Sequence, residues 1–285
     1  MSGPNLTFAR PVPATLRTSL LLPSHMTNNT ADIAVIVTTH NYGRFLKVCL
    51  DSILLQTLRP SQVLVIDDCS SDGTHSILRD YPDVSYHQVQ FENGNRARNF
   101  GFSKTNAEWV VFFDADNYMA PDFLKHLYAS VSDNLSFVYC DRVNFADGDV
   151  SWYPDPMGVW LSRGFNAEDL KRGNYVDLAS LIRAESFPGF DESLRRCQDW
   201  DLWLNLVLNR NGVGHYVNEA LFYYRIHGES ITRREDRDRA VWHIKRKYGL
   251  GLFSRIPLLR DAYFMFRILK TIKTWFRLAG AADTV

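Results

Sequence analysis

Strand-like and helix-like segments alternate four times between residues 33 and 113, and this alternation constrains the fold more than any other feature of the chain. Each apolar, β-branched run is followed by a segment whose apolar residues recur at helical spacing. The order predicts a parallel sheet with right-handed crossovers, a Rossmann-like half with helices on its faces. The expected strands are Ile33–Thr38, Val63–Ile66, Val84–Val89 and Trp109–Phe113, and the helices between them span about 43–56, 72–79 and 94–105.

Two carboxylates, Asp114 and Asp116, directly follow the last of these strands. The apolar run Trp109–Phe113 predicts a buried strand, and ligands bind at the carboxyl ends of strands in open α/β sheets. Two acids one residue apart can share a hard divalent cation, which often contacts substrate phosphates as well. We therefore expect a metal-dependent enzyme acting on a diphosphate compound. The alternative is a plain turn at Asp114–Asn117 before a helix that begins near Pro121.

Size and composition set wide bounds on the class of protein. The chain has 285 residues, of which 46% are hydrophobic, and its formal net charge is zero. This length supports one large core or two small ones, and the global basic field of a nucleic-acid-binding protein is absent. Four cysteines are scattered without a C-x-x-C pair. Such spacing favours buried thiols in a reducing compartment over disulfides or a zinc site.

We expect three segments along the chain and no spanning helix. Residues 1–30 are rich in Pro, Thr, Ser and Asn, which is typical of a disordered or loosely attached lead. Residues 31–250 form the folded domain, and residues 251–285 interleave basic and aromatic side chains. This tail predicts a basic amphipathic helix that lies on an anionic membrane surface or docks on the domain. Past residue 135 the expected elements are strands at Phe137–Val143, Tyr175–Arg183 and Leu221–Arg225 and a helix over 199–209.

Several motifs in a fixed order resemble the family 2 glycosyltransferases of the GT-A fold. They are Val35–Tyr42, Leu50–Thr57, Val63–Thr74, Ala97–Gly101, Asp114–Asp116, Gly189–Leu194, Gln198–Trp203 and Tyr224–Gly228, and together they cover roughly residues 33–230. The resemblance implies an α/β GT-A fold, with a Rossmann-like, mostly parallel central sheet flanked by helices and a C-terminal helical extension. It also implies an inverting enzyme that moves a sugar from a nucleoside diphosphate sugar to a hydroxyl of a saccharide or lipid-linked glycan.

The resemblance places the donor nucleotide sugar against Thr38, His40, Asp68, Arg98 and Asp114. The family has an aromatic ring near His40 against the nucleobase, and an imidazole can stack in the same way with less area. Asp68 would accept a hydrogen bond from the base edge, and the guanidinium of Arg98 can meet phosphate bidentately. The alternatives are a surface loop histidine at His40 and a solvated helix face at Arg98.

For the metal, the resemblance implies Mn²⁺ or Mg²⁺ held by Asp116, with Asp114 reaching ribose, sugar or metal-bound water. Such a cation neutralises charge on the departing nucleoside diphosphate. His227 aligns with a late histidine that completes the metal shell in some relatives. The alternative for His227 is a loop histidine that holds Gly228 and the preceding strand.

Asp199 is the expected general base, because its position before Trp200–Trp203 matches the family motif of an acid followed by an aspartate. In a single displacement, this carboxylate removes the proton from the acceptor hydroxyl as that oxygen attacks the anomeric carbon. The sequence departs from the family at Gln198, where Glu is common. An Asp heading an amphipathic helix is also a good N-cap, which is the structural alternative. Trp200 is expected to border the acceptor, or else to pack in the core.

Two rival interpretations remain open from the sequence. A nucleotidyltransferase can share this half-sheet, but those enzymes need a Gly-rich loop bearing Arg or Lys, and Thr39–Arg44 has too little glycine. A non-catalytic sugar- or nucleotide-binding protein of the same fold is left open by Gln198. The interpretation we adopt is a cytoplasmic glycosyltransferase that works at the inner face of the membrane. Its partners would be a nucleoside diphosphate sugar and a saccharide or lipid-linked acceptor, with no nucleic acid.

Overall fold

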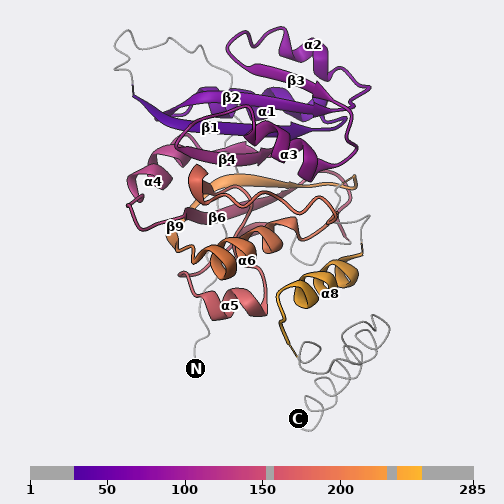
Figure 1. The fold of residues 1–285 in the computed structure, drawn as a ribbon. Coiled ribbons are helices and arrows are strands. Elements are labelled where there is room, and N and C mark those ends of the chain that lie inside the picture. Colours follow the sequence, from indigo (N-terminus) through magenta and orange to yellow (C-terminus); the bar gives the residue numbers. More distant parts are fainter. Residues whose placement is uncertain (1–28, 152–156, 230–235, 252–285) are drawn as a thin grey trace, which may run out of the picture.

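The structure is a computed structural model that describes residues 29–151, 157–229 and 236–251. The expected lead and tail fall outside these ranges except for residues 29, 30 and 251, so both expectations lie outside the described residues. The described chain folds into a nine-stranded sheet with helices on both faces (Figure 1). This architecture confirms the expected α/β class.

The first half of the sheet is parallel, as the alternation of strands and helices predicts. Its four strands pair side by side in the order β3-β2-β1-β4, and each neighbouring pair is parallel. All four expected strands are present, and each helix between them connects consecutive strands. The strands are β1 (Thr30–Thr39), β2 (Arg59–Asp68), β3 (Ser85–Val89) and β4 (Trp109–Asp114), and the helices are α1 (Gly43–Leu54), α2 (Thr74–Leu78) and α3 (Gly94–Phe102).

The second half contains short elements between longer ones. Its strands are β5 (Tyr118–Met119), β6 (Phe137–Ala146), β7 (Gly158–Trp160), β8 (Leu181–Arg183) and β9 (Gly214–Ile226). Its helices are α4 (Phe123–Ala129), α5 (Ala167–Arg172), the 3₁₀ turn η1 (Ala184–Ser186), α6 (Gln198–Arg210) and α8 (Arg237–Lys247). The expected helix over 199–209 is confirmed as α6.

Two expected strands in this half have the wrong length. The strand expected at Tyr175–Arg183 is reduced to the three residues of β8, because the preceding residues close a turn. In that turn the backbone N–H of Ala179 donates to Oδ1 of Asp177, and the N–H of Ser180 donates to the carbonyl of Leu178. In contrast, β9 begins at Gly214, seven residues before the expected start, in a half-exposed stretch that lacks an apolar signal.

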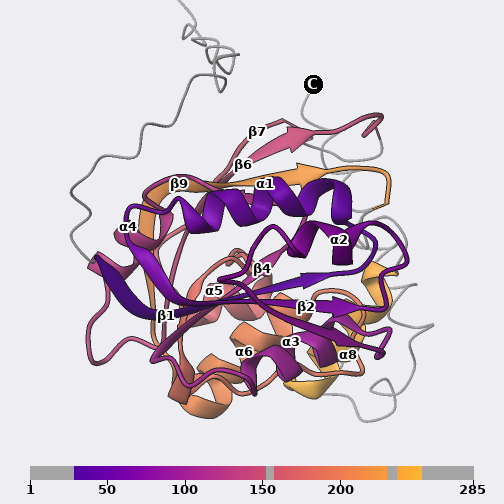
Figure 2. The same ribbon diagram turned by 90° about the horizontal axis from the view of Figure 1, so that it is seen from above.

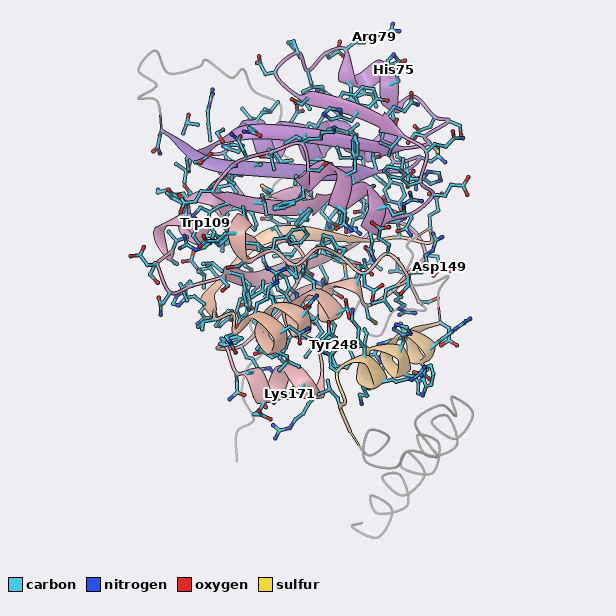
Figure 3. All side chains as sticks on the ribbon, in the orientation of Figure 1. His75, Arg79, Trp109, Asp149, Lys171 and Tyr248 are labelled. Atoms are coloured by element: carbon cyan, nitrogen blue, oxygen red, sulfur yellow. The ribbon has the colours of Figure 1, made fainter. Side chains whose placement is uncertain are left out.

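All of the long strands run in one direction. The sheet order is β3-β2-β1-β4-β8-β6-β9-β5, with β7 paired to β6. The short strand β8 is antiparallel to both β4 and β6, so β6 is parallel to β4, and β9 is parallel to β6. The carboxyl ends of β1, β2, β4, β6 and β9 therefore share one edge, and the expectation of a mostly parallel sheet is confirmed. In Figure 3, Trp109 opens β4 at the opposite end from Asp149, which follows β6 at this edge.

Apolar side chains alternate between two cores, one on each face of the sheet. Along β1, Val35 and Val37 pack toward α1, α2 and α4, whereas Ala34 and Ile36 pack toward α3, α5 and α6. Seen from above, α1 and α2 lie on one side of the sheet and α3, α6 and α8 on the other (Figure 2). A strand buried on both faces needs a continuous apolar run, which explains the sequence pattern of these strands.

Helix α3 packs tightly on the sheet at Gly101. A Cβ atom at this position would lie 2.5 Å from Cγ2 of Ile36 and 2.9 Å from Cγ1 of Ile66. Only glycine permits this close approach of the helix to β1 and β2. The approach fixes the position of α3, whose first turn begins at the carboxyl edge.

The last described helix, α8, is attached to the domain through a buried ion pair. Nζ of Lys247 lies 2.9 Å from the carboxylate of Asp201 on α6 and 2.8 Å from that of Asp191. The next residue, Tyr248, donates its hydroxyl hydrogen to the carbonyl of Asp201 over 3.0 Å (Figure 3). The carboxylate of Asp201 is 2% exposed, so burying it without this cation would be costly.

Two further features concern the cysteines and the helices. All four cysteines are free thiols, and Cys49 and Cys140 are buried. Within the part of the chain that the structure describes, no helix is long and apolar enough to cross a membrane.

Candidate active site

The residues expected to bind the donor gather at the carboxyl edge of the sheet. Thr38, the next-to-last residue of β1, pairs with Asp114 of β4 in the parallel register, and Asp68 is the last residue of β2. At the other side of the edge, β6 and β9 run together to Ala146 and Ile226, and His227 follows directly. Residues far apart in sequence are thus brought together by the common direction of the strands.

Asp68 is held by the backbone of the loop before α3. One carboxylate oxygen accepts the N–H groups of Phe91 (2.6 Å) and Glu92 (2.9 Å), and the other accepts that of Asn93 (2.7 Å). A carboxylate has about four lone-pair sites, so one site is left for a further donor such as a base N–H. The structure thus gives Asp68 an architectural task in addition to the expected one.

His40 is exposed beside Asp68, and its ring orientation is defined. Its Nδ1 lies 2.5 Å from the carbonyl oxygen of Asp68, which can only accept, so Nδ1 carries the proton. The other nitrogen, Nε2, then accepts from the side-chain amide of Asn41 over 3.2 Å. These two contacts fix the ring of the loop histidine and leave its faces available for stacking.

Arg98 is buried and ion-paired, so the alternative of a solvated helix face is wrong. Its Nη2 donates to Oδ1 of Asp114 over 2.7 Å, and Nη1 donates to Oδ1 of Asn95 over 3.2 Å. The side chain of Arg98 is 7% exposed and that of Asp114 is 35% exposed. The Nε–H of Arg98 is buried without a partner. Arg98 therefore orients Asp114, which is the more accessible member of the pair.

Asp116 and His227 form a second pair at this edge. Nε2 of His227 lies 3.0 Å from Oδ2 of Asp116, and the imidazole is packed edge-on against the rings of Tyr42 and Phe45. Nδ1 of His227 is buried without a hydrogen-bond partner. Burial raises the pKa of Asp116, His227 opposes that rise, and the carboxylate of Asp114 adds to it.

The backbone around Asp116 is tied to β9, which makes the acidic turn rigid. Nε of Arg225 donates to the carbonyl of Asp116 over 2.9 Å, and the N–H of Arg225 donates to Oδ1 of Asn117 over 3.0 Å. The guanidinium of Arg225 also lies over the ring of Phe45 at 4.4 Å. A plain surface turn would not need these contacts, so the turn between Asp114 and Asn117 is a built part of the edge.

The three expected metal ligands are not assembled into one cluster. Among the described residues, no group of three or more His, Cys, Asp and Glu side chains has the geometry to hold a metal ion. Asp114 is paired with Arg98 and does not join the other two side chains. Oδ2 of Asp116 and Nε2 of His227, in contrast, are 3.0 Å apart. Two adjacent ligands in an octahedral shell, each about 2.1 Å from the ion, are separated by about this distance. Because Mg²⁺ often binds one or two protein ligands together with phosphates and water, Asp116 and His227 fit such a cation as a two-ligand site.

Asp199 lies in the first turn of α6, next to two hydrogen-bond donors. Its Oδ2 accepts from the side-chain amide of Asn174 over 2.7 Å, and its Oδ1 accepts from the N–H of Trp200 over 2.8 Å. The N-cap of α6 is Cys197, so the capping alternative for Asp199 is wrong. Burial, with the carboxylate of Asp177 nearby, raises the pKa of Asp199 to about 6. A carboxylate with this pKa can accept a proton near neutral pH.

Trp200 was expected on the acceptor side, and the structure places it in the core instead. The residue is 4% exposed, and its indole Nε1 donates to the carbonyl of Leu170 at 2.7 Å. This contact joins α5 to α6, because a buried indole N–H needs an acceptor. The core alternative is therefore the correct one for Trp200.

The sequence analysis missed a polar cluster beside Asp199. Arg142 on β6 is ion-paired with Asp177, and its Nε donates to Oδ1 of Asn144 over 3.0 Å. Its guanidinium lies 4.6 Å from the ring of Trp160 and 4.0 Å from that of Tyr224. The available signal was three polar residues, Asp141, Arg142 and Asn144, inside an otherwise apolar strand.

The sheet order and the acids along its carboxyl edge define an α/β enzyme with its ligand crevice at that edge. The family model described as Glycosyl transferase family 2 matches residues 34–188, which is more than half of the chain. The chain therefore belongs to glycosyl transferase family 2. This membership confirms the expected enzyme class and excludes the nucleotidyltransferase alternative.

Curated relatives agree with this assignment. GlyA, a glycosyltransferase of Streptococcus pneumoniae, is 30% identical over 80% of this chain and 35% of GlyA. EpsH of Bacillus subtilis is 24% identical over 72% of this chain and 64% of EpsH. EpsJ of the same organism is 24% identical over 76% of this chain and 67% of EpsJ. The chain thus spans less than two thirds of the length of GlyA and of EpsH.

Solved structures show the same fold. TarS of S. aureus in complex with UDP-GlcNAc has a TM-score of 0.60 and 20% identity, over 76% of this chain and 65% of that chain. The mannosyltransferase PcManGT of Pyrobaculum calidifontis, in complex with GDP-Man and Mn²⁺, has a TM-score of 0.58 and 18% identity, over 89% and 76%. At these identities the likeness establishes the GT-A fold alone.

Proposed function

We propose that the chain is an inverting, metal-dependent glycosyltransferase that moves a sugar from a nucleoside diphosphate sugar to an acceptor hydroxyl. One observation supports this proposal most: Asp116 and His227 pair at the carboxyl edge of the sheet, and Asp199, with a pKa of about 6, lies in the field of Arg142 on β6, a strand that ends at the same edge. A proton acceptor and a phosphate-side site on one edge are the two parts that a single displacement needs.

Asp199 is the general base in this proposal. As the acceptor oxygen attacks the anomeric carbon, its proton moves to Asp199, and the bond from the anomeric carbon to the diphosphate oxygen breaks. The attack comes from the side opposite the leaving group, which inverts the anomeric configuration. At pH 7 a carboxyl with a pKa of about 6 is mostly ionised and ready to accept. A positioned base of this kind contributes typically ~10²–10⁴ in rate.

Four side chains hold the nucleotide sugar. We infer that the ring of His40 stacks on the nucleobase and that the free lone pair of Asp68 accepts from the base edge. Arg98 holds Asp114, whose accessible oxygen accepts hydroxyl groups of ribose or sugar. Thr38, which pairs with Asp114 in the strand register, lines the donor side of the site. The neighbours TarS and PcManGT carry UDP-GlcNAc and GDP-Man, which supports a donor of this chemical class.

Asp116 and His227 are the residues that would hold Mn²⁺ or Mg²⁺. The 3.0 Å separation between Nε2 of His227 and Oδ2 of Asp116, together with the raised pKa of Asp116, fits a pair of ligands for a cation. When bound, the cation neutralises charge on the diphosphate leaving group. The pair itself orients the diphosphate toward Asp199, and Asp114 remains with Arg98 as a contact for the sugar.

The proposal also covers the acceptor and the cellular location of the enzyme. TuaG of Bacillus subtilis, described as a putative teichuronic acid biosynthesis glycosyltransferase, is 24% identical over 78% of this chain and 90% of TuaG, which supports a saccharide or lipid-linked acceptor. The basic and aromatic composition of residues 251–285 supports contact with the cytoplasmic face of a membrane. Partition of the full chain into vesicles with and without anionic lipid tests that contact.

The substitution Asp199→Asn tests the proposal directly. Turnover should fall by ~10²–10⁴, because the amide cannot accept the proton, while donor binding is retained. The measurement is loss of donor from a panel of UDP-, GDP- and dTDP-sugars in Mn²⁺, with binding followed by calorimetry. The matched control is Asp133→Asn at an exposed loop residue, which should behave as the parent. Full turnover by the Asp199 variant would remove this residue as the base.

A further inference from the structure

Asn174 contacts the proposed base directly, and its amide orientation is defined by the structure. Its Oδ1 accepts the backbone N–H of Val176 over 3.1 Å, so Nδ2 is the group that points to Asp199. Nδ2 donates to Oδ2 of Asp199 over 2.7 Å, which is a short contact for a charged acceptor. The amide therefore fixes one oxygen of the base in place.

The segment that carries Asn174 is anchored on both sides. Tyr175 and Val176 are buried, and the carbonyl of Val176 accepts from the indole of Trp203 on α6 over 3.0 Å. The hydroxyl of Ser162 donates to the carbonyl of Tyr175 over 2.5 Å. Because Trp203 lies one turn after Asp199 on the same helix, the segment and the base are held in one fixed relation.

The same segment ends in a buried ion pair close to the base. Asp177 is paired with Arg142, and each side chain is 11% exposed. Oδ1 of Asp177 accepts the N–H of Ala179, and the guanidinium of Arg142 lies between the rings of Trp160 and Tyr224. Neither charge can move away from its place without losing several contacts.

Asp199 faces charged groups from each neighbouring element. Asp177 lies on the segment before β8, and Arg142 lies on β6. On its own side, the thiol of Cys197 precedes α6, and Arg196 and Arg237 lie near that thiol. The negative Asp177 disfavours the ionised base, whereas Arg142 favours it. The two members of the pair therefore act on the ionisation of Asp199 in opposite directions.

We propose that Asn174 and the Asp177–Arg142 pair are positioning residues for Asp199: the amide orients the carboxylate, and the ion pair sets its readiness to accept a proton. This proposal rests on the proposed function, in which Asp199 is the base. Asn174 occupies one oxygen and leaves the remaining lone pairs for the acceptor hydroxyl. Neither residue needs to touch substrate to act in this way.

The first experiment measures the base itself, without turnover. The full chain is labelled with [4-¹³C]aspartate, and the carboxyl resonance of Asp199 is assigned by its absence in Asp199→Asn. Its titration midpoint should move down in Asp177→Asn, which removes a nearby negative charge. It should move up in Asn174→Ala, which removes a donor to the charged form. Each shift is expected to be about 0.5–1 pH unit, and the control Asn134→Ala, at an exposed loop residue, should leave the midpoint unchanged.

The second experiment connects the titration to the reaction. Asn174→Ala should lower kcat about 10- to 100-fold with an unchanged KM for the donor, as is typical for a residue that orients a reacting group. Asp177→Asn should shift the acidic limb of the kcat profile to lower pH. The proposal is overturned if both variants keep the parent midpoint, or if the midpoints move while kcat and its pH profile do not.

The outcomes separate this proposal from the function on which it rests. An active Asp199→Asn variant removes the base, whatever the other variants do. An inactive Asp199→Asn variant together with parent-like Asn174 and Asp177 variants removes only the positioning roles. If Asp177→Asn does not fold, as judged by circular dichroism, Asn174→Ala decides the question alone. Its amide is partly exposed and pairs with no charged group except Asp199.

Discussion

The acid proposed to contact the donor and the acid proposed as the base are held in different ways. On the donor side, Asp68 accepts three backbone N–H groups from one adjacent loop. On the acceptor side, Asp199 accepts one side-chain amide from a distant segment and the N–H of the residue that follows it. Asp68 is thus fixed by hydrogen bonds to the backbone, whereas Asp199 has more unused lone pairs and a raised pKa. A ligand contact can be held rigidly by the backbone with one lone pair to spare, but a base has to be able to take a proton.

The largest expected effect comes from the pair formed by Asp116 and His227. Asp116→Asn should lower turnover about 10³-fold, because a bound divalent ion contributes several kcal/mol of charge stabilisation. Donor affinity should also lose its dependence on Mn²⁺, which calorimetry with and without EDTA measures. Asp133→Asn is the control. Unchanged metal dependence in the Asp116 variant would mean that the cation is held elsewhere.

The next effect concerns Asp68 and the three backbone N–H groups that it accepts. Asp68→Asn replaces an oxygen by an amide nitrogen that cannot accept the loop N–H groups, and two or three charged hydrogen bonds are weakened. We expect a loss of about 3 kcal/mol in the free energy of unfolding. Urea denaturation measures it, with Asp83→Asn, an exposed acid before β3, as the control. A loss below about 0.5 kcal/mol would contradict the architectural role of Asp68.

A smaller effect is expected from a change in the packing of α3 against β1 and β2. Gly101→Ala would place a Cβ atom 2.5 Å from Ile36 and force α3 away from the sheet. Overpacking of this kind costs about 2 kcal/mol and should displace the loop that holds Asp68. Gly73→Ala, where a Cβ meets no heavy atom within 4 Å, is the control. Thermal denaturation compares the two, and equal midpoints would show that α3 can shift without cost.

The smallest expected effect is a gain, not a loss, in the free energy of unfolding, and it concerns Asp199. Its pKa is raised in the folded chain to about 6, so the contribution of this residue to stability is full below about pH 4 and is lost as the pH rises through 6. Asp199→Asn cannot ionise and should gain about 1 kcal/mol over the parent between pH 4 and pH 8, after allowance for the partial exposure of the group. Urea denaturation at the two pH values measures the difference. A constant difference would show that Asp199 titrates normally.

The donor half of the fold could be predicted because its signals are local. The strands β1, β2 and β4 contain continuous apolar runs, Asp68 and Asp114 end strands, and Asp116 follows two residues later. Parallel strands place such ends at one edge, so Asp68, Asp114 and Asp116 could be placed there without coordinates. The Arg98–Asp114 pair was not foreseen, because a charged residue in a helix normally faces solvent and only the close approach at Gly101 buries this one.

The acceptor half depends on contacts between distant residues. Arg142 and Asp177 are 35 positions apart and meet only because β8 lies between β4 and β6. Asn174 lies 25 positions before Asp199, directly before the stretch 175–183 that the sequence predicts as strand and that the structure folds partly as a turn. Trp200 follows the same logic, because its helical position is compatible with either a ligand contact or the core. Only the partner at Leu170 decides between them.

The bridge made by Lys247 has a practical consequence for anyone who shortens this chain. One ammonium group neutralises Asp191, in the loop whose carbonyl accepts from Asn95, and Asp201, in the helix that begins beside the base. A stop codon placed before position 247 would leave two carboxylates facing each other without a counter-ion. Expression plasmids for crystallisation or enzymology should therefore retain the chain at least through Tyr248, even when the remainder of the tail is removed.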